Sequence, residues 1–275
     1  MALSSCFVLK IGGEIARSAE LAALAGDIVA LVRKGHAIVV VHGGGPQVTE
    51  LQKSLGQTPN VVAGRRITDA AALSAVKMAV AGAVNVDVCS ALVRAGGAPV
   101  GLHGASSQAI RARKRPPVVV AGGGPDPIDF GHVGDVTGVN QALLELLVGA
   151  GHTPVLACLG ADESGAVYNI NADAVASRVA SSLGARALVL VTDVPFVRFD
   201  AADETSRVPR MTKGEAESAI REGRIKGGMI PKLTEAFAAL EQGVSAVLIV
   251  GRLAVGDLAR ALEAPGEMGT LLTAG

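Results

Sequence analysis

Short apolar runs alternate with longer stretches of helical periodicity along most of this chain. The apolar runs have the continuous hydrophobic character of strands that are covered on both faces of a sheet. They are Cys6–Ile11, Ala37–Val41, Pro99–Leu102, Thr153–Ala157, Ala187–Val191 and Ala246–Val250. The stretches between them predict helices at about 20–34, 46–55, 70–95, 138–150, 172–183, 212–222, 231–242 and 256–262. This alternation predicts an α/β fold, a three-layer sandwich in which helices cover both faces of a mainly parallel sheet.

Two segments break the alternation. Residues 56–69 and 109–137 carry prolines, glycines and short valine runs, which predict hairpins at the edge of the sheet. The pattern also changes near residue 170, after which an αβ segment carries the polar run 200–213. We therefore expect two domains, 1–170 and 171–275.

Composition narrows the class of partner. The 275 residues hold 25 basic and 25 acidic side chains, with 2% aromatic residues and no Trp, so neither a basic field nor a stacking platform for nucleic acid is present. The hydrophobic content of 49% is high, but Lys77, Asn85 and Asp87 interrupt the longest apolar stretches, which argues against a membrane span. No signal-peptide core precedes Lys10, so we expect a cytoplasmic protein acting on small molecules.

The three cysteines have no metal-ligand spacing and are odd in number, which indicates neither a zinc site nor a disulfide framework. We expect them to be buried apolar residues. They are Cys6, Cys89 and Cys158.

Two lysines beside paired glycines are the strongest chemical signal. Lys10 ends the first apolar run and precedes Gly12-Gly13, and Lys232 follows Gly227-Gly228 at the start of a predicted helix. Lysine charge together with closely approaching backbone N–H groups is what a polyphosphate site needs. The pair predicts phosphoryl transfer.

A strand that runs into three glycines and a proline, His42–Pro46, predicts an anion-binding loop at a helix start. It lacks the Gly-Lys-Ser/Thr of a Walker loop and the third glycine of a dinucleotide fingerprint. The triplet Gly122–Gly124 also follows a valine run, but Pro127 comes soon after it, so we interpret it as a hairpin turn. A glycine triplet alone is therefore equally consistent with a turn that binds nothing.

Two further polar segments leave alternatives open. In Asn169–Asp173 the carboxylate of Asp173 could cap a helix, or it could lie between the two lysines and hold them. In Gly64–Asp69, one arginine could bind a carboxylate bidentately, although adjacent arginines are more often solvated.

These motifs, in this order, resemble the amino acid kinase family over nearly the whole chain. The matching segments are Lys10–Gly13, His42–Pro46, Gly64–Asp69, Val84–Asn85, Gly131–Gly134, Tyr168–Asp173, Leu190–Val194, Gly227–Lys232 and Gly269–Thr270. The chain is most similar to members that use ATP and Mg²⁺ to phosphorylate the γ-carboxylate of N-acetyl-L-glutamate, giving N-acetyl-L-glutamyl 5-phosphate for arginine biosynthesis. The resemblance implies that 1–170 binds the amino acid and dimerises, and that 171–275 binds the nucleotide.

The resemblance also implies roles for the matching residues. Lys10 and Lys232 would stabilise the transferring phosphoryl group, and Asp173 would orient both lysines. The remaining implied contacts are N–H donors at Gly12, Gly13, Gly44 and Gly45, the substrate α-carboxylate at Arg66 and Asn169, and the nucleotide at Thr192, Asp193, Gly227 and Gly228. No protein ligand for a metal is expected.

This chemistry is physically consistent. A side-chain carboxyl with a pKa of about 4.3 is already ionised at neutral pH, so the acceptor needs no general base. Positioning and charge neutralisation remain as the catalytic tasks. His42 is then expected to be structural.

Three other functions and two departures from the family pattern bear on this interpretation. A kinase of carrier-protein-bound glutamate or aminoadipate would use the basic cluster at 111–115; a non-catalytic amino-acid sensor would lack Lys10, Asp173 or Lys232; and a nicotinamide-dependent oxidoreductase would need the dinucleotide fingerprint. The segment His103–Ser107 lacks a Lys and an Asp that are usual in the family, and Phe196 replaces a common glycine.

The amino terminus leads to an expectation about assembly. Arginine-inhibited members of the family resemble one another in having an extra helix before the first strand, whereas the residues before Cys6 fall far short of the ~12–15 that a stable helix needs. We therefore expect a homodimer that does not respond to arginine. Its two-fold contact is expected near the helix at 70–95.

Overall fold

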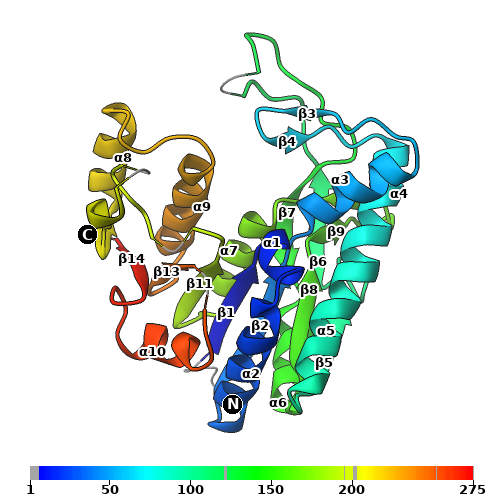
Figure 1. Ribbon diagram of the computed structural model, residues 1–275. Coiled ribbons are helices and arrows are strands. Elements are labelled where there is room, and N and C mark those ends of the chain that lie inside the picture. Colours follow the sequence, from blue (N-terminus) through cyan, green and yellow to red (C-terminus); the bar gives the residue numbers. More distant parts are fainter. Residues whose placement is uncertain (1–5, 121–122, 195, 201–202, 252, 275) are drawn as a thin grey trace.

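The computed structural model describes residues 6–120, 123–194, 196–200, 203–251 and 253–274. Within these ranges one large sheet has the order β12-β14-β13-β11-β1-β2-β8-β5 (Figure 1). Its strands are β1 (Cys6–Ile11), β2 (Ala37–His42), β5 (Pro99–Leu102), β8 (Thr153–Ala157), β11 (Ala187–Val191), β12 (Arg210–Thr212), β13 (Val247–Val250) and β14 (Gly269–Thr273). Only the β13–β14 pair is antiparallel among these neighbours. The expected mainly parallel sheet is confirmed.

A second, smaller sheet has the order β10-β9-β6-β7, and β3 pairs with β4 in a hairpin. These strands are β3 (Val61–Val62), β4 (Arg65–Arg66), β6 (Ile110–Lys114), β7 (Gly134–Val139), β9 (Leu159–Ala161) and β10 (Val167–Asn169). The expected hairpin in 109–137 therefore joins a separate sheet and does not extend the edge of the large one. The turn expected at Gly122–Gly124 lies partly outside the described residues, although Val118 and Ile128 form an antiparallel bridge across its base.

Helices cover both faces of the large sheet, as the sandwich prediction requires. One apolar core joins the sheet to α2, α5 and α10, and another joins it to α6, α7, α8 and α9. The helices are α1 (Gly13–Ala16), α2 (Glu20–Arg33), α3 (Gly45–Ser54), α4 (Ala70–Val76), α5 (Asn85–Arg94), α6 (Gln141–Gly149), α7 (Ala172–Ser182), α8 (Lys213–Arg221), α9 (Met229–Glu241) and α10 (Asp257–Glu263), with short η1 (Lys77–Val84) and η2 (Glu204–Ser206) segments.

One predicted helix boundary is wrong. The helix expected at 138–150 begins only at Gln141, because Gly138 and Val139 complete strand β7. The side chain of Asn140 accepts a hydrogen bond from Leu143 N at 3.2 Å and caps α6. Apolar residues continue from the strand into the helix, so periodicity alone did not mark the break, whereas the capping asparagine does.

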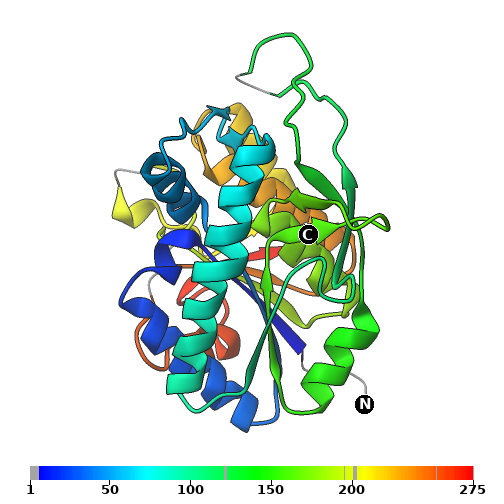
Figure 2. The same ribbon diagram turned by 90° about the vertical axis from the view of Figure 1, so that its right-hand side faces the viewer.

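The helix expected at 70–95 is one long rod that crosses the molecule, shown in cyan in Figure 2. Its middle third, Lys77–Val84, is a π-helix, which the sequence pattern did not predict. This rod, Ala70–Arg94, is also the one helix among the described residues that is long and apolar enough to cross a membrane by length and composition, a test that core helices of soluble proteins also pass.

The topology fixes where a ligand can bind. The chain passes from β1 to β2 on one side, and β11 later pairs with the other side of β1, so the strand order reverses direction at β1. Because β1, β2, β8, β11 and β13 run parallel, their carboxyl ends meet at one edge. Open α/β sheets bind ligands in the crevice at such a switch point.

Candidate active site

Strand alternation directs Lys10 into the site. Phe7, Leu9 and Ile11 belong to the core that holds α2, so their neighbours along β1 face the opposite side, where α7 packs. Lys10 is 7% exposed, and its Nζ lies 2.9 Å from Asp173 Oδ1. A buried lysine paired with a mostly buried carboxylate therefore lies at the end of the central strand.

Asp173 is not the cap of its helix. The side chain of Asn171 caps α7 by accepting hydrogen bonds from the N–H groups of Asp173 (2.7 Å) and Ala174 (3.3 Å), which leaves the carboxylate of Asp173 free to face the lysines. Burial raises the pKa of Asp173, but the positive charges of Lys10 and Lys232 outweigh it, and the net shift is downward. The charges of the two lysines therefore keep this carboxylate ionised.

Lys232 lies in the first turn of α9, close enough to share this electrostatic field. Burial lowers its pKa, the charge of Lys10 lowers it further, and the carboxylates of Asp173 and Asp193 act in the opposite direction. The net shift is downward. Two lysines therefore share one electrostatic field with the carboxylates of Asp173 and Asp193. An incoming polyanion would be attracted to both ammonium groups.

The first glycine pair follows β1. Gly12 N donates to Val191 O at 3.2 Å, so this N–H is already used within the protein. We expected it to donate to a ligand, and the structure directs it to β11 instead. Gly13 opens α1 and touches the second loop: a Cβ there would lie 2.8 Å from Pro46 Cδ and 3.3 Å from Gly44 Cα. Glycine is needed at Gly13 because the two loops approach each other closely.

The second glycine loop opens α3 with no side-chain cap. Gly44 is the N-cap residue and Gly45 the first helical residue, so their N–H groups lie in the uncapped first turn. A Cβ on Gly44 would meet Val80 Cγ2 at 3.1 Å and Val84 Cγ2 at 3.3 Å, because this loop packs against the π-helical segment. The arrangement is an uncapped helix start beside the carboxyl end of β1, where Gly43 N donates to Ile11 O at 3.1 Å, and such a helix start can bind an anion.

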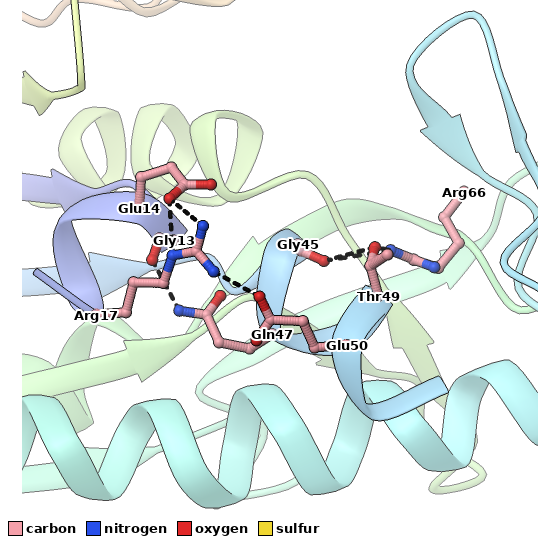
Figure 3. A network of polar contacts seen from close by, with 8 residues as sticks. All are labelled: Gly13, Glu14, Arg17, Gly45, Gln47, Thr49, Glu50 and Arg66. Carbon is pink, nitrogen blue, oxygen red and sulfur yellow. Dashed lines mark hydrogen bonds and ion pairs between the residues drawn. The ribbon is translucent and has the colours of Figure 1, made fainter. Parts of the chain in front are cut away.

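The structure brings Arg66 to the same loop (Figure 3). Its Nη2 donates to Thr49 Oγ1 at 2.7 Å and to Gly45 O at 3.3 Å, and its Nη1 contacts Gln52 Oε1. Asn169 is linked to this arginine through Thr68: Asn169 Nδ2 donates to Thr68 Oγ1 at 3.1 Å, and Thr68 Oγ1 donates to Arg66 O at 3.3 Å. Arg66 and Asn169, which are 103 positions apart, therefore border one region.

The residues expected on the nucleotide side follow β11 and precede α9. Thr192 is buried and donates from Oγ1 to Asp193 Oδ1 at 2.9 Å, and its N–H donates to Val250 O at 2.9 Å. Gly227 has φ +59°, and Gly228 is the N-cap of α9 without a side-chain cap. Asp193 also contributes to the field at Lys232, which connects this side to the lysine cluster.

The side chains that hold the two glycine loops together were not predicted from the sequence (Figure 3). Gln47 Nε2 donates to Gly13 O at 2.7 Å, so α3 holds the loop after β1. Beside it, Arg17 contacts Glu14 at 2.6 Å and Glu50 at 2.6 Å, joining α1 to α3. No local pattern marks the contacts of Gln47 with Gly13 and of Arg17 with Glu50, because the partners are 34 and 33 positions apart.

These parts define a class of protein: a phosphotransferase of the α/β type, in which lysine charges and uncapped helix starts meet at the switch point of a parallel sheet. The chain belongs to the amino acid kinase family, whose model matches residues 5–251.

Similar proteins agree with this assignment. An acetylglutamate kinase of Sorangium cellulosum (strain So ce56) is 56% identical over 96% of this chain and 93% of its own length. The acetylglutamate kinase of Methanocaldococcus jannaschii is 40% identical over 97% of this chain and 90% of its own. A solved N-acetylglutamate synthase from Neisseria gonorrhoeae, complexed with coenzyme A and N-acetyl-glutamate, has a TM-score of 0.81 and 26% identity; the match covers 98% of this chain and 59% of that longer one.

Proposed function

We propose that this protein is an acetylglutamate kinase, which transfers the γ-phosphate of ATP to the γ-carboxylate of N-acetyl-L-glutamate. The observation that carries the proposal is the buried Lys10–Asp173 pair at 2.9 Å, which shares its field with Lys232 at the sheet's switch point. The similarity of the whole chain to acetylglutamate kinases supports the choice of substrate.

The residues divide the catalytic work as follows. The acceptor carboxylate is ionised at neutral pH, so no side chain has to remove a proton from it. Lys10 and Lys232 stabilise charge on the phosphoryl oxygens as they pass between donor and acceptor, and Asp173 keeps both ammonium groups in place. Gly44 and Gly45 offer N–H groups, and Arg66 offers a guanidinium to the α-carboxylate.

Mg²⁺ belongs to the substrate in this scheme. The described residues contain no group of three or more His, Cys, Asp or Glu side chains that could hold a metal ion. Mg²⁺ is commonly bound through substrate phosphates, water and at most one or two carboxylates. We therefore expect it to enter as the MgATP complex, where it neutralises phosphate charge.

The alternative function, a kinase of carrier-protein-bound glutamate or aminoadipate, needs a free basic surface. Most of the basic cluster at 111–115 already contacts other groups of the protein. Lys114 pairs with Asp129 at 3.1 Å and Arg115 with Asp135 at 2.7 Å, while Arg111 donates to Val139 O at 3.0 Å. These contacts favour a free amino acid. The sensor alternative is disfavoured because Lys10, Asp173 and Lys232 are all present and clustered.

Hydroxylamine trapping tests the function. The protein is incubated with ATP, MgCl₂ and N-acetyl-L-glutamate, L-glutamate, N-acetyl-L-aspartate or a carrier-bound glutamate, and the acyl phosphate is captured as a hydroxamate. We expect a hydroxamate with N-acetyl-L-glutamate above all others. A product only from the carrier-bound substrate would support the rival kinase, and no product from any of them would support the sensor.

We also propose that the enzyme works as a homodimer in the cytoplasm. Cys6, Cys89 and Cys158 are all free thiols, as suits a reducing compartment. The rod Ala70–Arg94 leaves large apolar side chains in solvent, with Met78, Val86 and Val93 between 51% and 62% exposed. A contact between two copies would cover this face.

A further inference from the structure

His42 and Asn85 form a buried polar chain that the catalytic scheme does not use. His42 is fully buried at the end of β2, and its Nδ1 lies 3.0 Å from Gly43 O. Its Nε2 lies 2.9 Å from Asn85 Nδ2, and the same Nδ2 donates to Val155 O at 3.0 Å. The series of hydrogen bonds therefore runs from the carbonyl of Val155 on β8, through the side chains of Asn85 and His42, to the carbonyl of Gly43.

The two backbone carbonyls at its ends fix every hydrogen in this chain. A carbonyl oxygen can only accept, so the NH₂ group of Asn85, and not its oxygen, must face Val155. That NH₂ group then donates to His42 Nε2, which must carry no proton. At the other end Gly43 O also only accepts, so His42 Nδ1 must carry the proton. Both ends require the same form, the neutral Nδ1–H tautomer.

Burial supports the neutral form independently. Desolvation lowers the pKa of His42 to about 4, although its hydrogen bond with Gly43 acts in the opposite direction. A protonated ring would also place an Nε2–H against the NH₂ group of Asn85, where two donors would face each other. His42 therefore keeps one tautomer throughout the pH range in which the substrate carboxylates are ionised.

The carbonyl that His42 holds belongs to the peptide whose N–H is part of the anion-binding loop. In a planar trans peptide the C=O of residue 43 and the N–H of residue 44 point in opposite directions. Fixing the oxygen of Gly43 towards His42 therefore directs the N–H of Gly44 away from the core. The rod restrains the same peptide, because Val80 and Val84 contact the position of Gly44 and Asn85 follows directly in the chain.

We propose that His42 is a positioning residue of this kinase: as the Nδ1–H tautomer selected by Asn85, it holds the Gly43 carbonyl and so aims the Gly44 N–H at the reacting anions. The proposal rests on the proposed function for what the N–H meets. The hydrogen-bond direction itself stands on the contacts alone.

The tautomer is tested directly by nuclear magnetic resonance on the ligand-free protein with ¹⁵N-labelled histidine. Long-range ¹H–¹⁵N correlations distinguish a protonated from an unprotonated ring nitrogen, and His42→Gln identifies its signals among the five histidines. We expect a protonated Nδ1 and an unprotonated Nε2 that persist from pH 8 to pH 5. An Nε2–H tautomer, or an imidazolium in this range, would overturn the proposal.

Kinetics test the positioning role. His42→Asn keeps an amide donor near the place of Nδ1, whereas His42→Gln carries its donor near the place of Nε2. We expect His42→Asn to keep most of the activity. His42→Gln should lose up to about 100-fold in kcat/KM for N-acetyl-L-glutamate, because a misplaced donor disturbs the geometry of the reacting groups. The KM for ATP should change less than about twofold.

Both variants place a hydrogen-bonding amide in the cavity that the ring of His42 fills, so a difference between them reports on donor position. Equal losses in both, with equal falls in melting temperature, would mean that His42 only fills the core, and the positioning role would be rejected. Absence of hydroxamate from the unmodified protein would reject the proposed function instead. The tautomer measurement does not depend on activity and would remain valid.

Discussion

At the scale of single residues, the site is a balance of three charges. Lys10 and Lys232 repel each other, and the negative charge of Asp173, which pairs with Lys10 and also acts on Lys232, offsets this repulsion. Lys232 adds a positive charge to this field only while it is protonated. The ionisation of this lysine is therefore a functional property.

Replacing Lys232 by Ala should lower kcat by about 10²–10³-fold, because a charge that acts on the transferring phosphoryl group is lost. The KM values should change much less. Steady-state kinetics by hydroxamate formation measure both. Lys53→Ala, which removes an exposed lysine from α3, is the matched control and should leave kcat unchanged. A near-normal kcat in the Lys232 variant would rule out its assigned role.

The pH dependence of kcat reports on the same lysine. Its pKa is lowered, so its charge, and with it kcat, should be lost on the alkaline side before an ordinary lysine with a pKa of 10.5 would deprotonate. Asp173→Asn removes a carboxylate that raises this pKa, so the alkaline limb should move to still lower pH. Profiles of kcat between pH 7 and pH 10 measure the position of this limb in both proteins. A limb that stays in place in the Asp173 variant would show that Asp173 does not raise the pKa of Lys232.

Arg66→Lys should raise the KM for N-acetyl-L-glutamate by about tenfold, the effect of losing roughly 1.4 kcal/mol when a point charge replaces a bidentate fork. The KM for ATP should remain nearly constant. Arg65→Lys alters the adjacent, exposed arginine and serves as control. Equal rises in both KM values would show that Arg66 supports the loop fold through Thr49 and Gln52 and does not select the acid.

At the scale of elements, one buried acid joins two helices that lie far apart in the sequence. Asp27 on α2 is 5% exposed, and its carboxylate accepts hydrogen bonds from Gly256 N (2.7 Å) and Leu258 N (3.0 Å). These are first-turn donors of α10, which has no side-chain cap of its own. The acid thus caps a helix more than 220 positions away, and sequence inspection of α10 alone gives no sign of it.

Asp27→Ala should lower the free energy of unfolding by about 1–3 kcal/mol, since one buried and one partly buried N–H group lose their acceptor. Urea denaturation followed by circular dichroism measures it. The control Asp87→Ala removes an exposed acid from α5 and should change stability by less than about 0.5 kcal/mol. Equal losses in both variants would contradict the capping role. Because Asp27 is not part of the site, kcat should be unaffected.

The sequence predicted elements where a long periodic pattern specified them and failed where pairing partners were distant. Strand β1 and the rod Ala70–Arg94 carry enough local signal to be located within a residue or two. The three-residue strands Leu159–Ala161 and Val167–Asn169 exist because they pair with each other, which no local pattern specifies. The π-helical segment has the composition of an ordinary helix, so nothing in the sequence distinguishes it.

The same division holds for the site. Lys10, Lys232 and the second glycine loop were singled out because charge and glycine next to a strand end or helix start have a recognisable chemistry. Gln47, which clamps Gly13, was not, since its partner lies 34 positions away. Gly12 was assigned as a ligand donor, but the backbone of β11 already uses its N–H.

At the scale of the whole molecule, the apolar face of the rod predicts assembly. Val86→Glu places a charge in the proposed two-fold contact and should convert dimers into monomers in light scattering at micromolar concentration. Val255→Glu, at a side chain that is 81% exposed before α10, is the control and should leave the dimer intact. A Val86→Glu protein that remains dimeric would place the contact elsewhere.

The division into domains 1–170 and 171–275 remains a prediction.

The position of β1 at the centre of the sheet has a consequence for synthesis of the chain. Its second neighbour, β11, follows about 175 residues later in the sequence. At ribosomal rates of ~5–20 residues per second, one edge of β1 stays open for roughly 10–35 s. During that interval the nascent chain exposes an apolar strand edge that can template pairing with other chains. We expect chaperones that shield nascent strands to determine the yield of this enzyme more than its final stability does.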